Sequence, residues 1–168
     1  DEVKILAGGQ SLIPMMKLRL AAPEALVDLS RIAALKGVRE EGSEIVVGAM
    51  TTQHQLLQDP ILTEKVPLIP ETSAVIADPQ IRYRGTLGGN VANGDPGNDM
   101  PAVMMTLDAL YVLTGANGTR VVKAREFYQG AYFTAAEDGE ILTAVRIPTT
   151  LAGAGYAYEK LKRKVGDY

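Results

Sequence analysis

The feature that most constrains this chain is a glycine-rich stretch over residues 85–101, GTLGGNVANGDPGNDMP. It holds five of the chain's 17 glycines, at positions 85, 88, 89, 94 and 97. Glycine loses much conformational freedom on folding, and it concentrates where the backbone takes a positive φ or where another group approaches without a Cβ in the way. A packed core does not need glycine at this density, so the stretch indicates a closely approached ligand.

The polar side chains of the same stretch indicate the kind of ligand. They are small hydroxyl and amide groups together with two carboxylates: Thr86, Asn90, Asn93, Asn98, Asp95 and Asp99. Runs of backbone N–H groups in glycine turns form concave anion sites, while carboxylates and amides accept from or donate to hydroxyl groups. A ligand with both phosphate and sugar parts would use both kinds of group.

A second glycine turn lies near the N-terminus, after an apolar run at residues 3–6 that predicts a buried strand. The turn consists of Ala7, Gly8, Gly9, Gln10, Ser11 and Leu12, and a helical pattern follows it. Strand, glycine turn and helix is an order typical of phosphate binding, although this is not the dinucleotide fingerprint GxGxxG and a single Gly-Gly pair is weak evidence. Two such loops in one short chain could hold a pyrophosphate from opposite sides.

The rest of the pattern predicts an α+β chain of two lobes. The first lobe, residues 1–52, contains a βαβ unit with a strand at 3–7, a helix at 11–18 and a strand at 25–29, followed by a strand pair at 38–40 and 45–48. The second lobe, residues 53–168, begins with helices. Thr51 or Thr52 is expected to cap the first of them, and Pro67 and Pro70 are expected to bound the segments at 61–66 and 68–76.

The second half of the chain is expected to be mostly antiparallel β beside this helical layer. The predicted elements are a helix at 102–107, a hairpin of 110–113 with 120–123, a helix at 124–128, and strands at 141–147 and 156–165. In the last strand, Lys160, Lys162 and Lys164 would share a face with Tyr156 and Tyr158. That face is either a solvated edge that discourages aggregation, or a subunit contact or an attraction for phosphate.

Composition excludes several classes of function. A net charge of −3 gives no electrostatic argument for nucleic acid binding, and the apolar runs are shorter than the ~20 residues that span a bilayer. The chain has no cysteine and one histidine, so it cannot by itself hold an iron–sulfur cluster and is poorly suited to zinc or haem. If it takes part in redox chemistry, electrons must travel on an organic cofactor and any metal must lie in partner chains.

Three long motifs carry a family resemblance: AGGQSLIPMMKLRL at 7–20, ADPQIRYRGTLGGNVANGDPGNDMPA at 77–102 and GYAYEKLKRKVGDY at 155–168. They resemble the FAD-binding subunits of the molybdenum hydroxylases, and above all the medium, flavoprotein subunits of aerobic carbon monoxide dehydrogenases. The resemblance implies the FAD-binding fold of the vanillyl-alcohol oxidase and p-cresol methylhydroxylase type. In that fold the AGGQS and TLGGN loops clasp the FAD pyrophosphate.

The resemblance also implies a function and partners. Electrons would pass from iron–sulfur clusters in a partner chain through FAD to an external acceptor, and substrate would be oxidised at a molybdenum cofactor in a third chain. The complex would be cytoplasmic, where it could lie against the inner face of the membrane. Alternatives are an FAD subunit of a xanthine or nicotinate dehydrogenase type of complex, or an assembly module that has lost FAD.

The residues expected to bind the cofactor are Ala7, Gly8, Gly9, Gln10, Ser11, Leu12, Ile76, Thr86, Gly88, Gly89, Asn90, Asp95, Asp99 and Tyr168. Ser11 could instead serve only as a helix cap, Asp95 could belong to an ordinary Asp-Pro-Gly turn, and Asp99 could cap the helix that follows it. By resemblance, Tyr168 lies against the isoalloxazine ring. No side chain is expected to be catalytic, and His54 is expected to be structural.

Both ends of the sequence are expected to be cut. The chain starts within a strand and stops after Gly-Asp-Tyr at 166–168. The family resemblance implies a short segment before residue 1 and a further C-terminal domain after residue 168.

Overall fold

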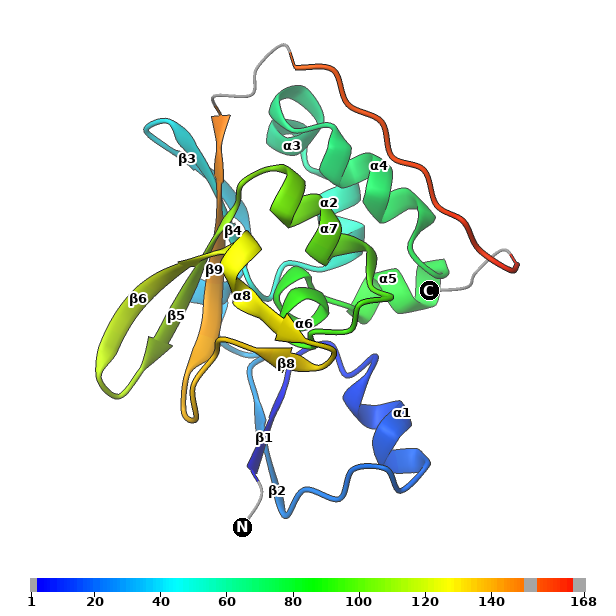
Figure 1. Cartoon of the computed structure of the whole chain (residues 1–168), viewed down its shortest axis with the longest axis vertical. Coiled ribbons are helices and arrows are strands. Elements are labelled where there is room, and N and C mark those ends of the chain that lie inside the picture. The colour runs from blue at the N-terminus through cyan, green and yellow to red at the C-terminus, as the bar shows by residue number, and fades with distance from the viewer. Residues whose placement is uncertain (1–2, 150–153, 165–168) are drawn as a thin grey trace.

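The computed structural model describes residues 3–149 and 154–164. Its N-terminal part is the expected βαβ unit, drawn in blue in Figure 1, in which strand β1 (Val3–Leu6) pairs in parallel with β2 (Ala25–Asp28) and helix α1 (Leu12–Lys17) connects them. The pairing runs from Val3 opposite Ala25 to Leu6 opposite Asp28. The expectation that the strand at 3–6 is buried is wrong, because Val3 and Ile5 are exposed. The turn before α1 depends on Gly9, whose φ of +76° favours glycine.

A five-stranded antiparallel sheet forms the main body of the molecule. Its strands are β3 (Val38–Glu41), β4 (Glu44–Gly48), β5 (Leu110–Gly115), β6 (Gly118–Lys123) and β9 (Ile141–Pro148), in the order β3-β4-β9-β5-β6. Both expected strand pairs, 38–40 with 45–48 and 110–113 with 120–123, are confirmed. Strand β5 shows the alternation of a half-buried strand, because Tyr111 and Leu113 are buried while their neighbours are partly exposed.

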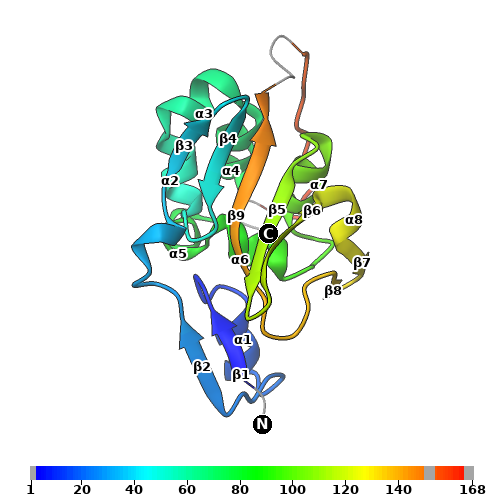
Figure 2. The same ribbon diagram turned by 90° about the vertical axis from the view of Figure 1, so that its left-hand side faces the viewer.

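A layer of short helices covers one face of this sheet (Figures 1 and 2). The helices are α2 (Gln53–Gln58), α3 (Pro60–Lys65), α4 (Leu68–Val75), α5 (Pro79–Arg84), α6 (Leu87–Ala92) and α7 (Asp99–Thr106). Side-chain caps start four of them, from Thr52, Asp59, Asp78 and Thr86. Of the two residues expected to cap the first helix, Thr51 and Thr52, it is Thr52 that does so, in a capping box with Gln55.

One expected helix boundary is wrong. Pro70 lies inside the first turn of α4 and does not end a helix. Its missing N–H costs little there, because N–H groups in the first turn of a helix have no acceptor within the helix.

The core lies between the sheet and the helices. The sheet contributes Ile45, Val47, Tyr111, Leu113, Val145 and Ile147, and the helices contribute Leu56, Leu62, Ile69, Leu87, Met100 and Met104. Phe127 ends the short helix α8 (Ala124–Phe127) and packs edge-on against Tyr111, with ring centroids 4.8 Å apart. The remaining short elements are η1 (Ala33–Leu35), β7 (Tyr128–Gly130) and β8 (Phe133–Thr134).

The strand expected at 156–165 is wrong for the part that the structure describes. Residues 154–164 form no strand; they run as an extended chain beside α4 and α7 (Figure 1). The alternating side chains do point to one side, but their partners lie on helices and not on a neighbouring strand. The Tyr156 hydroxyl donates to Glu71 Oε1 at 2.6 Å, and Tyr158 and Lys160 both donate to Asp99. A period of two indicates extended backbone without specifying the partner.

The sheet topology also bears on the division into lobes. Strands β3 and β4 belong to the five-stranded sheet, through pairing of β4 with β9. The βαβ unit is a separate two-stranded sheet. Because hydrogen bonds of one sheet should not cross a lobe boundary, we propose that the boundary lies between β2 and β3, earlier than the expected position at residue 52.

Candidate functional site

The two glycine loops lie against each other. A Cβ placed on Gly8 would come within 2.1 Å of the Arg84 carbonyl oxygen, and one placed on Gly89 within 3.3 Å of the Ala7 Cβ. A Cβ on Gly85 would be 3.7 Å from Gln10 Cγ. Residues 75 to 82 positions apart in sequence therefore form one composite surface, because the glycines allow the two backbones to approach.

The first loop presents backbone donors. Within the part of the chain that the structure describes, the N–H groups of residues 9–12 have no acceptor, and the first bond of this turn runs from Ile13 N to Gly9 O at 3.2 Å. Ser11 occupies the N-cap position of α1 but makes no side-chain capping bond. Its hydroxyl and the neighbouring N–H groups therefore remain open to another acceptor, as a phosphate-binding turn requires.

The second loop is built differently from the sequence-based expectation. Residues 87–92 form α6, and the N–H groups of residues 87–90 all donate within the chain: Leu87 to Thr51 O, Gly88 to Ala49 O, and Gly89 and Asn90 to Thr86. Its glycines serve close packing, since a Cβ on Gly88 would lie 2.5 Å from the Ala49 Cβ. Among the five glycines of the stretch, Gly94 is the one with a positive φ, +64°.

Asn90 leaves one polar atom in this loop without a partner. Its side-chain Oδ1 is buried and accepts no hydrogen bond within the described residues, whereas its backbone oxygen accepts from Asn98 Nδ2 at 2.8 Å. A buried unpaired polar group costs about 1–3 kcal/mol. An acceptor atom without a partner, next to the contact between the loops, is expected where a polar ligand binds.

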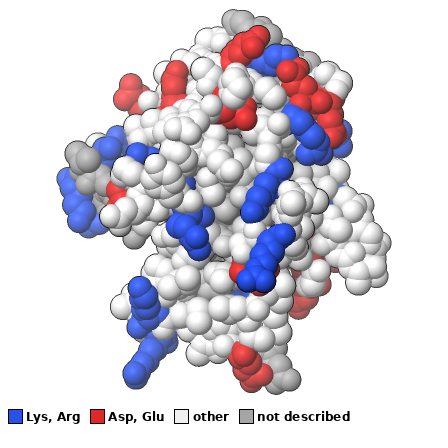
Figure 3. Space-filling model, turned by 180° about the vertical axis from the view of Figure 1, so that it is seen from behind, with Lys and Arg blue, Asp and Glu red and all other residues white. Residues whose placement is uncertain are grey.

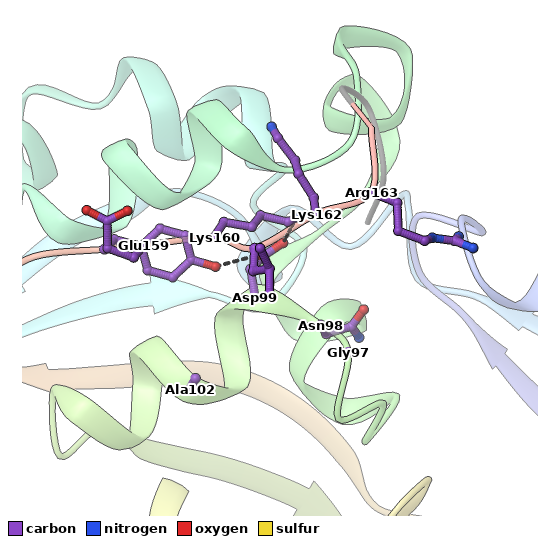
Figure 4. A pocket seen from close by; sticks show the side chains of 10 residues that line it. Gly97, Asn98, Asp99, Ala102, Glu159, Lys160, Lys162 and Arg163 are labelled. Atoms are coloured by element: carbon purple, nitrogen blue, oxygen red, sulfur yellow. Dashed lines mark hydrogen bonds and ion pairs between the residues drawn. The ribbon is translucent and has the colours of Figure 1, made fainter.

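Asp99 lines a cavity of about 520 Å³ between the start of α7 and the C-terminal segment (Figure 4). Its carboxylate accepts from the Tyr158 hydroxyl and, at 2.8 Å, from Lys160 Nζ. Asn98 holds the N-cap position of α7, so Asp99 is the first helical residue and not the cap. Burial, followed by the hydrogen bond and the charge of Asp99, raises the pKa of the Tyr158 phenol above its usual value.

The remaining expected residues have more ordinary surroundings. Ile76 is buried in the main core, and its carbonyl accepts from Arg82 Nη1 at 2.8 Å. Asp95 Oδ1 accepts from Gly97 N at 2.9 Å, as in an Asx turn. His54 packs its ring on Tyr83 with centroids 4.1 Å apart. Tyr168 lies outside the described residues.

Sequence reasoning missed three features of this site. Tyr158 and Lys160 were expected to share a face with Tyr156, Lys162 and Lys164, but these two side chains meet Asp99, while Tyr156 and Lys162 are exposed. Ala77 takes a φ of +43°, which is uncommon for a residue with a Cβ and marks local strain next to Ile76. The alternation of Tyr156, Tyr158 and Lys160 is the signal that could have revealed the first two. Ala77 begins a family motif, but its residue type does not indicate a positive φ.

Comparison with known protein families identifies the domain. A family model described as the FAD binding domain in molybdopterin dehydrogenase matches residues 1–150. The chain belongs to this family. Its cofactor is therefore FAD, and the expected resemblance and α+β FAD-binding fold are confirmed.

Three dehydrogenase subunits are similar to this FAD-binding chain over its full length. It is 65% identical over all 168 residues to the carbon monoxide dehydrogenase medium chain of Afipia carboxidovorans, and 52% identical to that of Hydrogenophaga pseudoflava. It is 40% identical to the glyceraldehyde dehydrogenase medium chain of Sulfolobus acidocaldarius. The matched region covers 58% of each carbon monoxide dehydrogenase chain, so the present chain spans little more than half of their length.

Solved structures agree with the sequence comparison. The reconstituted carbon monoxide dehydrogenase from Oligotropha carboxidovorans matches 99% of this chain and 58% of its own, with a TM-score of 0.97 and 66% identity. Quinoline 2-oxidoreductase from Pseudomonas putida 86 matches 99% of this chain and 57% of its own, with a TM-score of 0.94 and 38% identity. The FAD-binding fold is thus shared by enzymes that act on different substrates.

The geometry is compatible with FAD in this domain. The open N–H groups of the first loop suit a phosphate, and the unpartnered Asn90 Oδ1 and the Asp99 carboxylate suit hydroxyl or amide donors. Among the described residues, no three His, Asp or Glu side chains gather as a metal site. In the same residues, no helix is long and apolar enough to cross a membrane.

Proposed function

We propose that this chain is the FAD-binding part of a subunit that carries electrons within a molybdenum hydroxylase complex like carbon monoxide dehydrogenase. The observation that carries the proposal is the contact between the two glycine loops, made by Gly8 against Arg84 and by Gly89 against Ala7. The contact creates one surface, with N–H groups that can donate to a phosphate on the first loop and polar acceptor atoms on the second. The 65% identity to a carbon monoxide dehydrogenase medium chain supports the choice of complex.

The two loops would take different roles. The N–H groups of Gly9, Gln10 and Leu12, with the N–H and hydroxyl of Ser11, would hold the pyrophosphate. Gly8 would keep the loop against α5, and Ala7 would keep it against α6. Thr86, Gly88 and Gly89 would place α6 close enough for the Asn90 amide to contact the nucleotide. This division differs from a symmetric clamp, because the N–H groups of residues 87–90 already have acceptors.

The other expected residues complete the proposed site. Asp99 would accept from a ribityl or ribose hydroxyl, Asp95 would support the same loop, and Ile76 would line the flavin pocket beside the strained Ala77. Tyr168 would stack on the isoalloxazine. Basic side chains lie on the side of the molecule that carries α1 and the C-terminal segment, where they would favour approach of an anionic ligand (Figures 1 and 3).

FAD supplies the electron chemistry in such a subunit, and the chain's residues bind and orient it. The chain has no cysteine, so iron–sulfur clusters would belong to a partner subunit, and the molybdenum cofactor to another. We propose a cytoplasmic complex that passes electrons from the clusters to an external acceptor and that could associate with the inner face of the membrane.

The test is the cofactor content of the purified full chain. Denaturation and chromatography should release FAD, because one loop for pyrophosphate and separate acceptors for hydroxyl groups suit a dinucleotide. Release of FMN, or a preparation that neither contains a flavin absorbance band nor takes up FAD, would contradict the proposal. The second outcome would favour the assembly-module alternative.

The substrate of the complex needs a separate experiment. The 40% identity to a glyceraldehyde dehydrogenase chain and the structural likeness to quinoline 2-oxidoreductase keep aldehydes and nitrogen heterocycles as the second candidate. Reduction of the bound flavin in the assembled complex should follow addition of carbon monoxide. Reduction by an aldehyde or a heterocycle, but not by carbon monoxide, would assign the chain to another member of the family.

A further inference from the structure

The C-terminal segment 154–164 is held to the helices by a row of side chains from alternate residues. Tyr156 donates to Glu71 on α4 at 2.6 Å, and the next two members of the row, Tyr158 and Lys160, both donate to Asp99 on α7. Figure 4 shows Lys160 reaching Asp99 from this segment, and the Tyr158 hydroxyl donates to the same carboxylate. Two of the three anchors thus converge on one carboxylate, which a segment that only needed to be tied down would not require.

Asp99 is an unusual place for an anchor. It is 7% exposed, and the side chain of its partner Lys160 is 12% exposed, so the ion pair is largely removed from water. Desolvation of two charges is costly and is offset only when the geometry and additional hydrogen bonds are favourable. The Tyr158 hydroxyl supplies such a bond on Oδ1, while Lys160 occupies Oδ2.

The carboxylate keeps acceptor capacity after both bonds are made. An ionised carboxylate offers about four acceptor positions, and the two donors from the segment occupy two of them. The cavity beside Asp99 is lined by Gly97 and Asn98 of the glycine-rich stretch as well as by the segment. Fixing one oxygen by Tyr158 and the other by Lys160 also fixes the plane of the carboxylate, and hence the direction of the remaining acceptor positions.

We propose that Tyr158 and Lys160 are positioning residues that orient Asp99 for a hydroxyl group of the flavin nucleotide. The inference rests on the proposed FAD site and extends it to residues that do not themselves contact the cofactor. It follows that affinity for FAD depends on the Tyr158 hydroxyl although that hydroxyl points to Asp99. Tyr156, two residues earlier on the same row, fastens the segment without touching Asp99 and should not have this effect.

The experiment compares Tyr158→Phe with Tyr156→Phe in the full chain. Each variant removes one hydroxyl that donates to one carboxylate, on the same segment and two residues apart. FAD is titrated into apo-protein and flavin fluorescence is followed, with circular dichroism as the folding control. We expect the Kd for FAD to rise about tenfold in Tyr158→Phe, the range for a hydrogen bond to a charged group, and less than twofold in Tyr156→Phe.

Tryptic cleavage of the apo-protein within residues 160–164 measures how firmly the segment is anchored. Loss of either tyrosine hydroxyl should loosen the segment and speed cleavage, whereas only loss of the Tyr158 hydroxyl should weaken FAD binding. Equal loss of FAD affinity in the two variants, or no loss in Tyr158→Phe, would overturn the inference while FAD binding by the parent upheld the proposed function. A parent that takes up no FAD would overturn both. If Tyr158→Phe does not fold, Lys160→Met serves in its place, and unchanged FAD affinity in that variant would contradict the inference.

Discussion

Gly8 and Arg84 are in such close contact that a Cβ on Gly8 would lie 2.1 Å from the Arg84 carbonyl oxygen. Gly8 precedes α1, and Arg84 ends α5 in the helical layer over the large sheet. This contact attaches the βαβ unit to the rest of the molecule at the point where the cofactor is proposed to bind. The orientation of the two parts and the shape of the site therefore depend on the same glycine.

Gly8→Ala should separate the two loops. The new methyl group cannot fit without backbone movement, so we expect a loss of about 1–3 kcal/mol in the free energy of unfolding and a fall of more than tenfold in FAD affinity. Thermal unfolding and fluorescence titration measure the two effects. Gly155→Ala is the control, because a Cβ at Gly155 has no atom within 4 Å; similar losses in both variants would refute the contact as the cause.

Gly89→Val should weaken FAD binding more than Ser11→Ala. A Cβ on Gly89 would lie 2.9 Å from Thr86 Oγ1 and 3.3 Å from the Ala7 Cβ, so valine would disturb the α6 cap and push the loops apart. Ser11→Ala removes one hydroxyl, with an effect of about 0.5–1.5 kcal/mol, or up to ~3 if the partner is charged. Titration of apo-protein with FAD, with circular dichroism as the control, gives the order. Parental affinity in Gly89→Val would exclude this loop contact from the site.

Asn90→Ala should lower the affinity for FAD without lowering the stability of the apo-protein. The Asn90 Oδ1 is buried without a partner, so its removal leaves the thermal stability of the apo-protein nearly unchanged, within about 1 kcal/mol. FAD affinity should fall about tenfold if the amide contacts the nucleotide. A variant that is much less stable but binds FAD normally would show that the amide has a structural role instead.

The isolated full chain should contain no stoichiometric iron, molybdenum or zinc. It has no cysteine, and the described residues contain no cluster of potential metal ligands. Elemental analysis of the chain purified without partners measures this. One metal ion per chain would contradict electron transfer from clusters held by another subunit.

Acid should weaken the link between β6 and the loop before β9. The hydrogen bond from Arg120, then that from the Glu137 N–H, lower the pKa of Glu140 from its usual 4.5 to about 2. A carboxyl whose pKa is lower in the folded state stabilises the fold above its unfolded pKa, and this contribution disappears as the pH falls from about 4.5 towards 2.

The variant Glu140→Gln should therefore have a lower Tm at pH 7 and a flatter dependence of Tm on pH in the acid range. Glu126→Gln is the matched control, since Glu126 forms a more exposed ion pair with Lys123. Parallel pH profiles for the parent and Glu140→Gln would refute the role of this pair.

Much of the fold followed from local pattern. Apolar runs and turns located β1, β2 and the two hairpins, and the capping residue Thr52 located the start of α2, because hydrogen bonding within a few residues decides such features. The prediction that Pro70 ends a helix was wrong because proline is tolerated in the first turn of a helix as well as between helices. The strand prediction for 156–165 was wrong because alternation of side chains does not distinguish an extended chain in a sheet from one that lies on helices.

The site divides in the same way. The density of glycine and the absence of cysteine were sufficient to indicate a closely bound organic cofactor, since backbone crowding and thiolate chemistry are properties of residue type. Only the tertiary structure decided that the first loop keeps its N–H groups open while the second uses them within the chain, and that Asp99 meets Tyr158 and Lys160. These depend on contacts between residues distant in sequence, and the free energy of such contacts exists only once both partners are in place.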